Sequence, residues 1–286
     1  MDKIRMRTNA GSINLRVTTK DGSPCEVWNG GKKIAEMQSG TPQTVSIPNN
    51  AEEILIKGKD IQGLYCFRNQ LTALDVSGLT SLQELYCYYN QLTTLNVSGL
   101  TSLKKLDCDN NQLTALNVSG LTSFRLLDCY GNRLTTLNAS GCTSLQELYC
   151  YYNQLTTLNV SGLTSLKKLD CDNNKLTTLN ASDCTSLQRL GCSSNQLTAL
   201  DVSGCTSLVE LRCDDNQLAA EAFKKLFEDL PENKGVYCEA VLYTDGDSNY
   251  KDFSQPPELV EAFENAKRKG WTFYKQSNFY EREKIA

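Results

Sequence analysis

The sequence predicts a solenoid of stacked repeats that is closed at each end by a cap of different composition. Two observations support this prediction. From residue 61 onward, the pattern L-x-x-L-x-C-x-x-N-x-L-T-x-L-N/D-V/A-S-x-L/C-T-S recurs every 21 residues. One copy of the pattern cannot bury its own leucines and cysteine, whereas copies stacked on each other form a continuous core.

Residues 1–60 precede the repeats and are predicted to form a small β-rich cap. The segments INLRVTT and EILIKG are strand-like, and turn signals such as Asp21-Gly22 and Asn29-Gly30 separate the strand-like segments. We expect this cap to cover the exposed side of the first repeat. A separate binding module is the alternative.

Residues 61–218 hold the repeats, seven of them complete. In a segment such as ELYCYYN, apolar and polar residues alternate as in a half-buried strand, with Leu85 and Cys87 on the buried face. The second half, such as LTTLNVSGLTS, contains poor helix formers, so we expect it to be extended or irregular. The complete repeats begin at Ile61, Leu82, Leu103, Phe124, Leu145, Leu166 and Leu187, and a partial eighth runs from Leu208 to Leu218.

One stretch is written twice, because residues 85–111 and 148–174 are identical. The copies lie three repeats apart, so a block of three repeats was duplicated. The copied stretch includes Tyr86, Tyr88 and Tyr89, at positions that the repeat pattern leaves free. These tyrosines are therefore of more functional interest than the copied leucines.

The first eleven positions of each unit resemble the leucine-rich repeat, L-x-x-L-x-L-x-x-N-x-L, with cysteine replacing the third leucine. The chain is most similar to short-repeat bacterial members with the core C-x-x-N-x-L-T-x-L, from host-associated bacteria. The resemblance covers residues 61–218 and implies a horseshoe with one parallel strand per repeat on its concave face. It also implies a protein that is secreted or lies on the cell surface.

Residues 219–286 leave the repeat pattern and are expected to form a helix-strand cap. AAEAFKKLFEDLP and PPELVEAFENAKRKG have helical spacing and helix-ending prolines or glycine, whereas GVYCEAVLYT and WTFYKQ are strand-like. Such a cap shields the end of a solenoid core. The segment Asp245-Gly246-Asp247 imitates the start of a calcium loop, but a plain polar turn is favoured because the later ligand positions do not match.

Cysteine and asparagine each recur once per repeat and are expected to stack inward. Cys142, Cys184 and Cys205 stand where other repeats have leucine, which favours buried free thiols over disulfides or metal ligands. A buried asparagine amide can tie neighbouring turns of backbone together. The strand cysteines are Cys66, Cys87, Cys108, Cys129, Cys150, Cys171, Cys192 and Cys213, and the asparagines are Asn69, Asn90, Asn111, Asn132, Asn153, Asn174, Asn195 and Asn216.

Five further asparagines open N-x-S sequons in the second half of the repeat. Asp75 and Asp201 stand at the equivalent position in other repeats, so a short acceptor side chain that completes a turn explains both residue types. Glycan attachment is the less favoured reading. The sequon asparagines are Asn96, Asn117, Asn138, Asn159 and Asn180.

The composition argues against several classes of protein. A formal net charge of -4 is unsuited to binding nucleic acid, and the lack of histidine excludes Ser-His-Asp and Cys-His arrangements. No run of about 18 apolar residues is present, and the start lacks the apolar core of a signal peptide. We expect no catalytic residues, no cofactor, no metal and no membrane span.

Function should lie at positions three, five, seven and eight of the repeat, which the frame leaves free and which point to the concave face. Eight of the thirteen tyrosines are found there, and tyrosine is typical of binding surfaces. The alternative is that the tyrosines stabilise the sheet by cross-strand contacts. The candidate ligand-binding residues are Tyr65, Phe67, Tyr86, Tyr88, Tyr89, Asp107, Asp109, Asp128, Tyr130, Tyr149, Tyr151, Tyr152, Asp170, Asp172 and Arg212.

Aspartates on this face should repel one another. Asp107 and Asp128 are expected side by side on adjacent strands, with Asp109 close by. Either lysines such as Lys105 or a bound cation would relieve the repulsion.

The sequence therefore predicts a non-enzymatic binding protein that presents a face rich in tyrosine and aspartate to a protein ligand. The resemblance points to adhesion or host interaction, with a host extracellular protein as partner. A glycan ligand is the alternative, because aromatic rings beside carboxylates also suit sugars. A purely structural spacer is the third reading.

The buried-thiol prediction can be tested chemically. Because we expect reduced side chains, thiol titration of the unfolded, unreduced chain should report all thirteen cysteines. A markedly lower count would show that disulfides link the repeats.

Overall fold

The structure is a computed structural model that describes residues 1–48, 53–232, 235–278 and 281–286. It consists of two compact parts, Met1–Leu145 and Gln146–Ala286. We call them the N-terminal body, which holds the cap and repeats 1 to 4, and the C-terminal body, which holds repeats 5 to 8 and the second cap. The proposed domain boundaries at residues 60 and 218 remain predictions.

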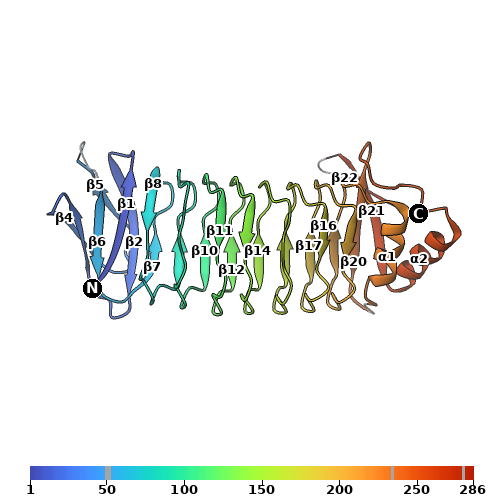
Figure 1. Cartoon of the computed structure of the whole chain (residues 1–286), viewed down its shortest axis with the longest axis horizontal. Helices are drawn as coiled ribbons and strands as arrows, with labels where there is room; N and C mark the ends of the chain where they lie inside the picture. Colours follow the sequence, from blue (N-terminus) through green and yellow to red (C-terminus); the bar gives the residue numbers. More distant parts are fainter. Residues whose placement is uncertain (49–52, 233–234, 279–280) are drawn as a thin grey trace. The chain divides into compact units, whose positions relative to one another are not determined.

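The N-terminal cap is made of antiparallel strands that extend the first repeat on both sides (Figure 1). On one side β2 pairs antiparallel with β7, the strand that opens the first repeat, and on the other side β1 pairs antiparallel with β8. The predicted β-rich cap is therefore confirmed. Its strands are β1 (Asp2–Thr8), β2 (Ser12–Thr19), β3 (Cys25–Asn29), β4 (Lys32–Met37), β5 (Gln43–Ser46) and β6 (Ile54–Gly58).

Each repeat of the N-terminal body adds one parallel strand in register with the last. Leu64, Leu85, Leu106 and Leu127 are paired directly along this ladder and are fully buried. The second half of the repeat is extended, as predicted, and forms its own parallel pair. The strands are β7 (Ile61–Tyr65), β9 (Glu84–Tyr86), β10 (Lys105–Asp107) and β12 (Leu126–Asp128), with β8 (Leu71–Asp75), β11 (Ala115–Asn117) and β13 (Thr136–Asn138) on the other side.

The C-terminal body repeats this arrangement and continues it into the cap. Strand β19 of the last repeat pairs parallel with β20, which pairs parallel with β21. The repeat strands are β14 (Glu147–Tyr149), β15 (Lys168–Asp170), β17 (Arg189–Gly191) and β19 (Glu210–Arg212), with β16 (Thr178–Asn180) and β18 (Ala199–Asp201) on the other side.

The C-terminal cap alternates helices and strands, which confirms the prediction. Phe223, Phe227 and Phe263 on the two helices form a buried aromatic cluster, and the helices lie side by side in Figure 1. The last strand was not predicted, because its sequence EREK is entirely charged. The elements are α1 (Ala220–Asp229), β20 (Cys238–Thr244), α2 (Pro257–Arg268), β21 (Trp271–Asn278) and β22 (Glu281–Lys284).

The cysteines lie in the core, as the repeat pattern predicts. All thirteen are buried and free. Burial raises the pKa of Cys66, so its thiol is neutral at physiological pH. Where cysteine replaces leucine, the thiol also donates to a backbone carbonyl of the preceding repeat, as from Cys142 Sγ to Val118 O at 3.0 Å. Cysteine here acts as a small apolar residue with a weak donor.

The asparagine ladder is confirmed and ties successive repeats together. Asn111 Nδ2 donates to the carbonyls of Cys87 and Cys108 at 3.0 and 3.1 Å, and its Oδ1 accepts the Leu92 N–H at 3.0 Å. One side chain therefore satisfies backbone groups of two repeats that water cannot reach.

The ladder continues into the C-terminal cap, which the sequence pattern did not predict. Asn249 accepts the Leu218 N–H at 2.8 Å and donates to the carbonyls of Cys213 and Leu242. Asp247, beside it, accepts the N–H groups of Asp215 and Thr244. The segment that imitates a calcium loop is thus a hydrogen-bonded turn that ends the ladder.

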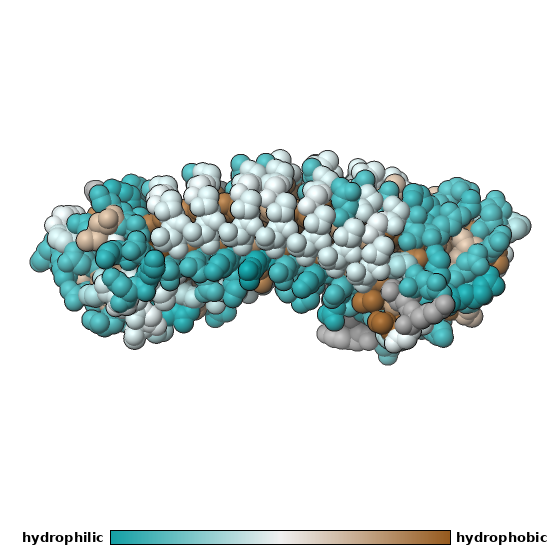
Figure 2. Space-filling view, turned by 90° about the horizontal axis from the view of Figure 1, so that it is seen from below, coloured by the Kyte–Doolittle hydropathy of each residue, from teal (hydrophilic) through white to brown (hydrophobic). Residues whose placement is uncertain are grey.

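The sequon asparagines instead complete local turns. Asn117 Oδ1 accepts the Ser119 N–H at 3.0 Å, and Asp201 accepts the Ser203 N–H at the same distance. This shared contact explains why both asparagine and aspartate occur at this position of the repeat. Figure 2 shows regularly spaced rows of near-neutral residues within the repeats, as expected where threonine, serine and glycine recur in each.

The two asparagine positions should differ strongly in their contribution to stability. Asn111→Ala leaves buried backbone groups unpaired and should lower the free energy of unfolding by about 2–4 kcal/mol. The matched control Asn117→Ala affects an exposed turn and should cost about 0.5–1 kcal/mol. Urea denaturation followed by circular dichroism measures both, and equal losses would contradict the ladder.

Candidate ligand-binding surface

The predicted site residues lie on the outward side of the parallel strands or in the turn that directly follows. Position five is the last residue of each strand, as for Tyr86 on β9 and Asp170 on β15. Positions seven and eight follow the buried cysteine. We call this surface, formed in each body by positions three, five, seven and eight, the strand face.

In the N-terminal body the aromatic residues of the strand face stack on one another. The Tyr65 and Tyr86 rings are parallel at 4.9 Å, and Phe67 and Tyr88 at 4.5 Å. The Arg16 guanidinium from the cap lies 3.4 Å from the Tyr65 ring centroid. These contacts are those that the sheet-stability reading of the tyrosines expects.

The predicted aspartate cluster is present beside this stack. Asp107 and Asp128 are directly paired on β10 and β12. Burial, with the neighbouring Asp109 and Asp128 carboxylates, raises the pKa of Asp107. The expectation that Lys105 relieves this repulsion is wrong, because its Nζ pairs with Glu84 at 3.2 Å. The raised pKa means that Asp107 keeps its proton to a higher pH than a free aspartate does. Among the described residues, no group of three acidic or cysteine side chains is arranged to hold a metal ion.

The charged residues at position three form ion pairs in both bodies. Lys168 pairs with Glu147 at 3.3 Å and Arg189 with Glu210 at 3.2 Å, in each case from one strand to the next. These side chains are partly exposed, so each pair contributes little to stability. Their charges are compensated within the sheet, which leaves positions five, seven and eight for a ligand.

Position eight has a left-handed backbone throughout the repeats. Its φ is 51° at Tyr152 and 63° at Gly131. Glycine, asparagine and aspartate suit this conformation, whereas a bulky residue is strained in it. Tyr89 and Tyr152 are strained for this reason and are 46% and 56% exposed. The left-handed residues are Arg68, Tyr89, Asn110, Gly131, Tyr152, Asn173, Ser194 and Asp215.

In the C-terminal body the strand face is hollowed into a cleft of about 540 Å³. Tyr151 and Tyr152 form one wall, with their rings edge to face at 5.7 Å. Asp170, Asp172 and Arg212 line the cleft. Thus five of the residues predicted from sequence come together in one place. Residues from later repeats and the cap also line it, namely Asn173, Ser193, Ser194, Asp214, Asp215, Thr244 and Gln276.

The carboxylates of the cleft are held by short hydrogen bonds. Asp172 Oδ1 accepts the Ser193 N–H at 2.6 Å. Asp214 accepts the Ser193 and Thr244 hydroxyls at 2.6 and 3.0 Å. Burial, and next the charge of Asp170, raises the pKa of Asp172 to about 7. Burial also raises the pKa of Asp170.

Gly191 opens a second, smaller hollow of about 270 Å³, the notch, which shares Asp170, Asp172 and Arg212 with the cleft. Gly191 lies between Asp170 and Arg212 on neighbouring strands. A Cβ at this position would lie 3.1 Å from Asp172 Oδ1 and 3.3 Å from Asp170 Oδ1. The absence of a side chain at Gly191 is what leaves these carboxylates open on that side.

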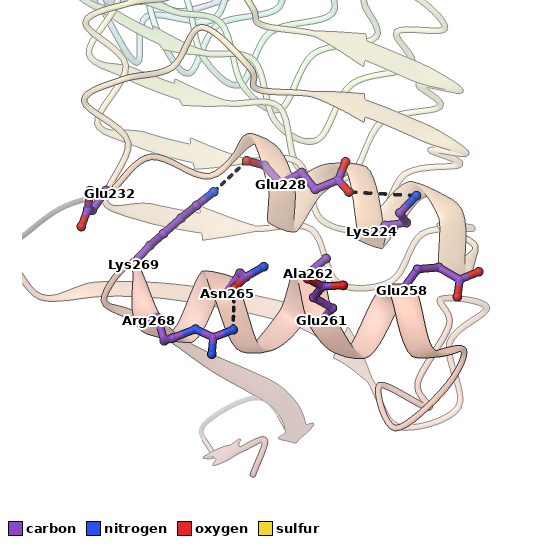
Figure 3. A pocket seen from close by; sticks show the side chains of 9 residues that line it. All are labelled: Lys224, Glu228, Glu232, Glu258, Glu261, Ala262, Asn265, Arg268 and Lys269. Carbon is purple, nitrogen blue, oxygen red and sulfur yellow. Dashed lines mark hydrogen bonds and ion pairs between the residues drawn. The ribbon is translucent and has the colours of Figure 1, made fainter.

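A further hollow of about 590 Å³ lies between α1 and α2 (Figure 3). Lys269 crosses to the end of α1 and donates to the carbonyls of Glu228 and Leu230, each at 2.7 Å. A basic group at a helix C-terminus satisfies carbonyls that have no helical partner. This hollow therefore surrounds a contact that joins the two helices, and we do not assign it a ligand.

Comparison with known proteins agrees with the repeat pattern. Residues 80–123 and 143–183 match the family model of leucine rich repeats (2 copies). The chain belongs to the leucine-rich-repeat family. No curated protein sequence matches it significantly.

Solved leucine-rich-repeat structures from Listeria monocytogenes are similar to the chain. The internalin inlF has a TM-score of 0.52 at 23% identity over 65% of this chain and 53% of that one. The functional domain of InlJ, which includes a cysteine ladder, has 30% identity over 70% and 52% of the two chains and a TM-score of 0.44. Internalin C2 has 30% identity over 55% and 73%, with a TM-score of 0.46. The chain spans about half the length of the first two.

Leucine-rich-repeat proteins of this bacterial kind are generally binding scaffolds, and the strand face is the surface that varies here. None of the helices in the described ranges is both long and apolar enough to cross a membrane. The list of candidate residues left out Asp214, Ser193 and Thr244, which also line the cleft. Asp214 and Ser193 stand at position seven, one of the positions where function was expected, whereas no pattern indicates Thr244.

The raised pKa of Asp172 predicts a stability that depends on pH. The pKa of Asp172 is about 7 in the folded chain, above the reference value of 3.8. The contribution of this carboxyl to the free energy of unfolding is therefore fully present below about pH 4 and is lost as the pH rises through about 7. Asp172→Asn removes the charge and keeps an acceptor for Ser193. We expect the variant to be more stable than the wild type by about 1–3 kcal/mol at pH 8, and the difference to close near pH 4.

Asp201→Asn is the control of opposite sign, since its hydrogen bonds with Ser203 lower the pKa of Asp201. The wild type should be the more stable protein at neutral pH, and the difference should vanish in acid. Urea denaturation across this pH range measures both variants. The same sign for both would refute the assignment.

Proposed function

We propose that the protein is a non-enzymatic binding protein whose strand face, centred on the cleft of the C-terminal body, holds a protein ligand. The cleft combines the exposed Tyr152 ring and the half-buried Tyr151 ring with oriented carboxylates and an arginine. Tyrosine and arginine are enriched among the residues that dominate protein interfaces. A role in adhesion or host interaction at a bacterial surface is part of the proposal, because Listeria internalins are among the similar structures.

The proposal depends on the exposure and the backbone conformation of Tyr152. It is 56% exposed and has a left-handed backbone with φ of 51°, where asparagine, found at the equivalent Asn110 and Asn173, would be less strained. A residue that costs stability where it stands and faces solvent favours a ligand over folding as its explanation. The equivalent Tyr89 differs, because the Arg68 guanidinium lies over its ring at 4.8 Å from the centroid. Tyr88 and Phe67, by contrast, are stacked within the sheet.

The test is the substitution Tyr152→Asn. It should raise the free energy of unfolding by about 1 kcal/mol, because the strain is relieved. It should also weaken capture of a partner from a panel of purified extracellular matrix proteins by roughly 10-fold or more. Unfolding by urea and binding by surface plasmon resonance supply the two measurements.

Two controls define the outcome. Tyr89→Asn makes the same change in the duplicated repeat of the N-terminal body and should relieve strain with little effect on binding. Thr156→Ala lies on the other side of the repeats and should change neither. If Tyr152→Asn loses stability and keeps full binding, the tyrosine serves the sheet and the proposal is wrong. A response on a glycan array, with none from the protein panel, would favour a sugar ligand.

A further inference from the structure

We propose that the cleft of the C-terminal body, where Gly191 opens it toward the notch, binds a basic side chain, arginine or lysine, of an extended segment of the protein ligand. The inference rests on the proposed function and specifies the chemistry of the partner at that site. It follows from the charges in the cleft, from its aromatic wall and from a comparison of the duplicated repeats.

Negative charge dominates the cleft. Asp170, Asp172, Asp214 and Asp215 line it, and Arg212 is the only basic residue among its lining. The notch is balanced in charge, because its lining holds Lys168, Arg189 and Arg212 with Asp170, Asp172 and Glu210, so the basic group binds on the cleft side of the two shared aspartates. Arg212 is one positive charge among four carboxylates: its ion pair with Asp214 is long at 3.8 Å, and its charge also favours the ionised forms of Asp170 and Asp172. Ligand cations are attracted to such a hollow, whose low-dielectric walls focus the field.

Arg212 supplies a second, independent observation. Its Nε is buried and has no hydrogen-bond acceptor among the described residues. A buried donor without an acceptor costs free energy. The Arg212 side chain as a whole is 36% exposed, so a small movement of it toward a ligand carbonyl would pair this donor and remove the cost. An extended peptide offers both groups together, a basic side chain for the aspartates and a backbone carbonyl for Arg212.

The wall of the cleft also suits a basic group. Tyr151 and Tyr152 stand at its edge with their rings at a 63° angle. A guanidinium or ammonium group placed over a tyrosine ring gains a cation–π contact in addition to the ion pair. A neutral or acidic side chain would gain neither contact.

The duplicated block provides an internal comparison. Asp107 and Asp109 are the copies of Asp170 and Asp172. In the N-terminal body the next strand places Asp128 beside Asp107, whereas in the C-terminal body Gly191 lies beside Asp170. The same two aspartates therefore face a side chain in one body and an open notch in the other. Only the second arrangement leaves room for a ligand group between them and Arg212.

The experiment uses the full chain labelled with ¹⁵N-glycine, so that the Gly191 amide is observed by NMR. Arginine blocked at both ends, N-acetyl-arginine amide, is titrated at about pH 8, where the Asp172 carboxyl with its pKa of about 7 is ionised. We expect a saturable shift of the Gly191 signal with a Kd on the order of 1 mM. Blocked lysine should act similarly, and blocked glutamine and glutamate should not.

The double variant Asp170→Asn/Asp172→Asn should weaken the arginine response at least about 5-fold, whereas Asp107→Asn/Asp109→Asn, the matched control, should leave it unchanged. Urea denaturation confirms that both variants fold. An equal response to glutamine, a stronger response to glutamate or equal losses in both variants would each overturn the inference. If Gly191 ignores arginine while Tyr152→Asn still abolishes capture, the proposed function stands and only the basic side chain is excluded.

Discussion

The structure depends on one constraint, namely that every tight turn of the repeat buries backbone groups that must still be hydrogen-bonded. The asparagine at position nine meets it by accepting an N–H of the preceding repeat and donating to carbonyls of both, as Asn111 does for Leu92, Cys87 and Cys108. Because this contact fixes the turn, the flanking residues are held in a set geometry. The left-handed position eight and the outward position seven follow from it, and so does the surface available to a ligand.

The same constraint explains how the stack ends. The last repeat needs an acceptor for the Leu218 N–H, and the C-terminal cap supplies Asn249 from outside the repeat pattern. At the other end, Asn69 accepts the Asn14 N–H and donates to the Asn14 carbonyl. A cap therefore shields apolar side chains and also completes the hydrogen bonds that a missing neighbour would have made.

Features that recur with the repeat were predictable, because stacking gives each periodic residue the same environment. The buried cysteines, the asparagine ladder and the extended second half belong to this group.

The cleft was only partly predictable. Its tyrosines and aspartates occupy variable positions, but Thr244 comes from the cap, and Gly191 acts by lacking a side chain. The raised pKa of Asp107 could not be foreseen either, since it depends on burial and on two neighbouring carboxylates. Strand β22 lacks the apolar alternation that identifies a strand.

The notch at Gly191 has a consequence for how such proteins acquire new functions. Two stretches of identical sequence have different chemistry because one faces Asp128 and the other Gly191 across a strand boundary. The heritable unit of duplication is a block of repeats, whereas the unit that recognises a ligand is the junction between one repeat and the next. Duplication therefore creates novelty where the copied block ends, and a single later substitution at that border can change what the copy binds without altering any copied residue.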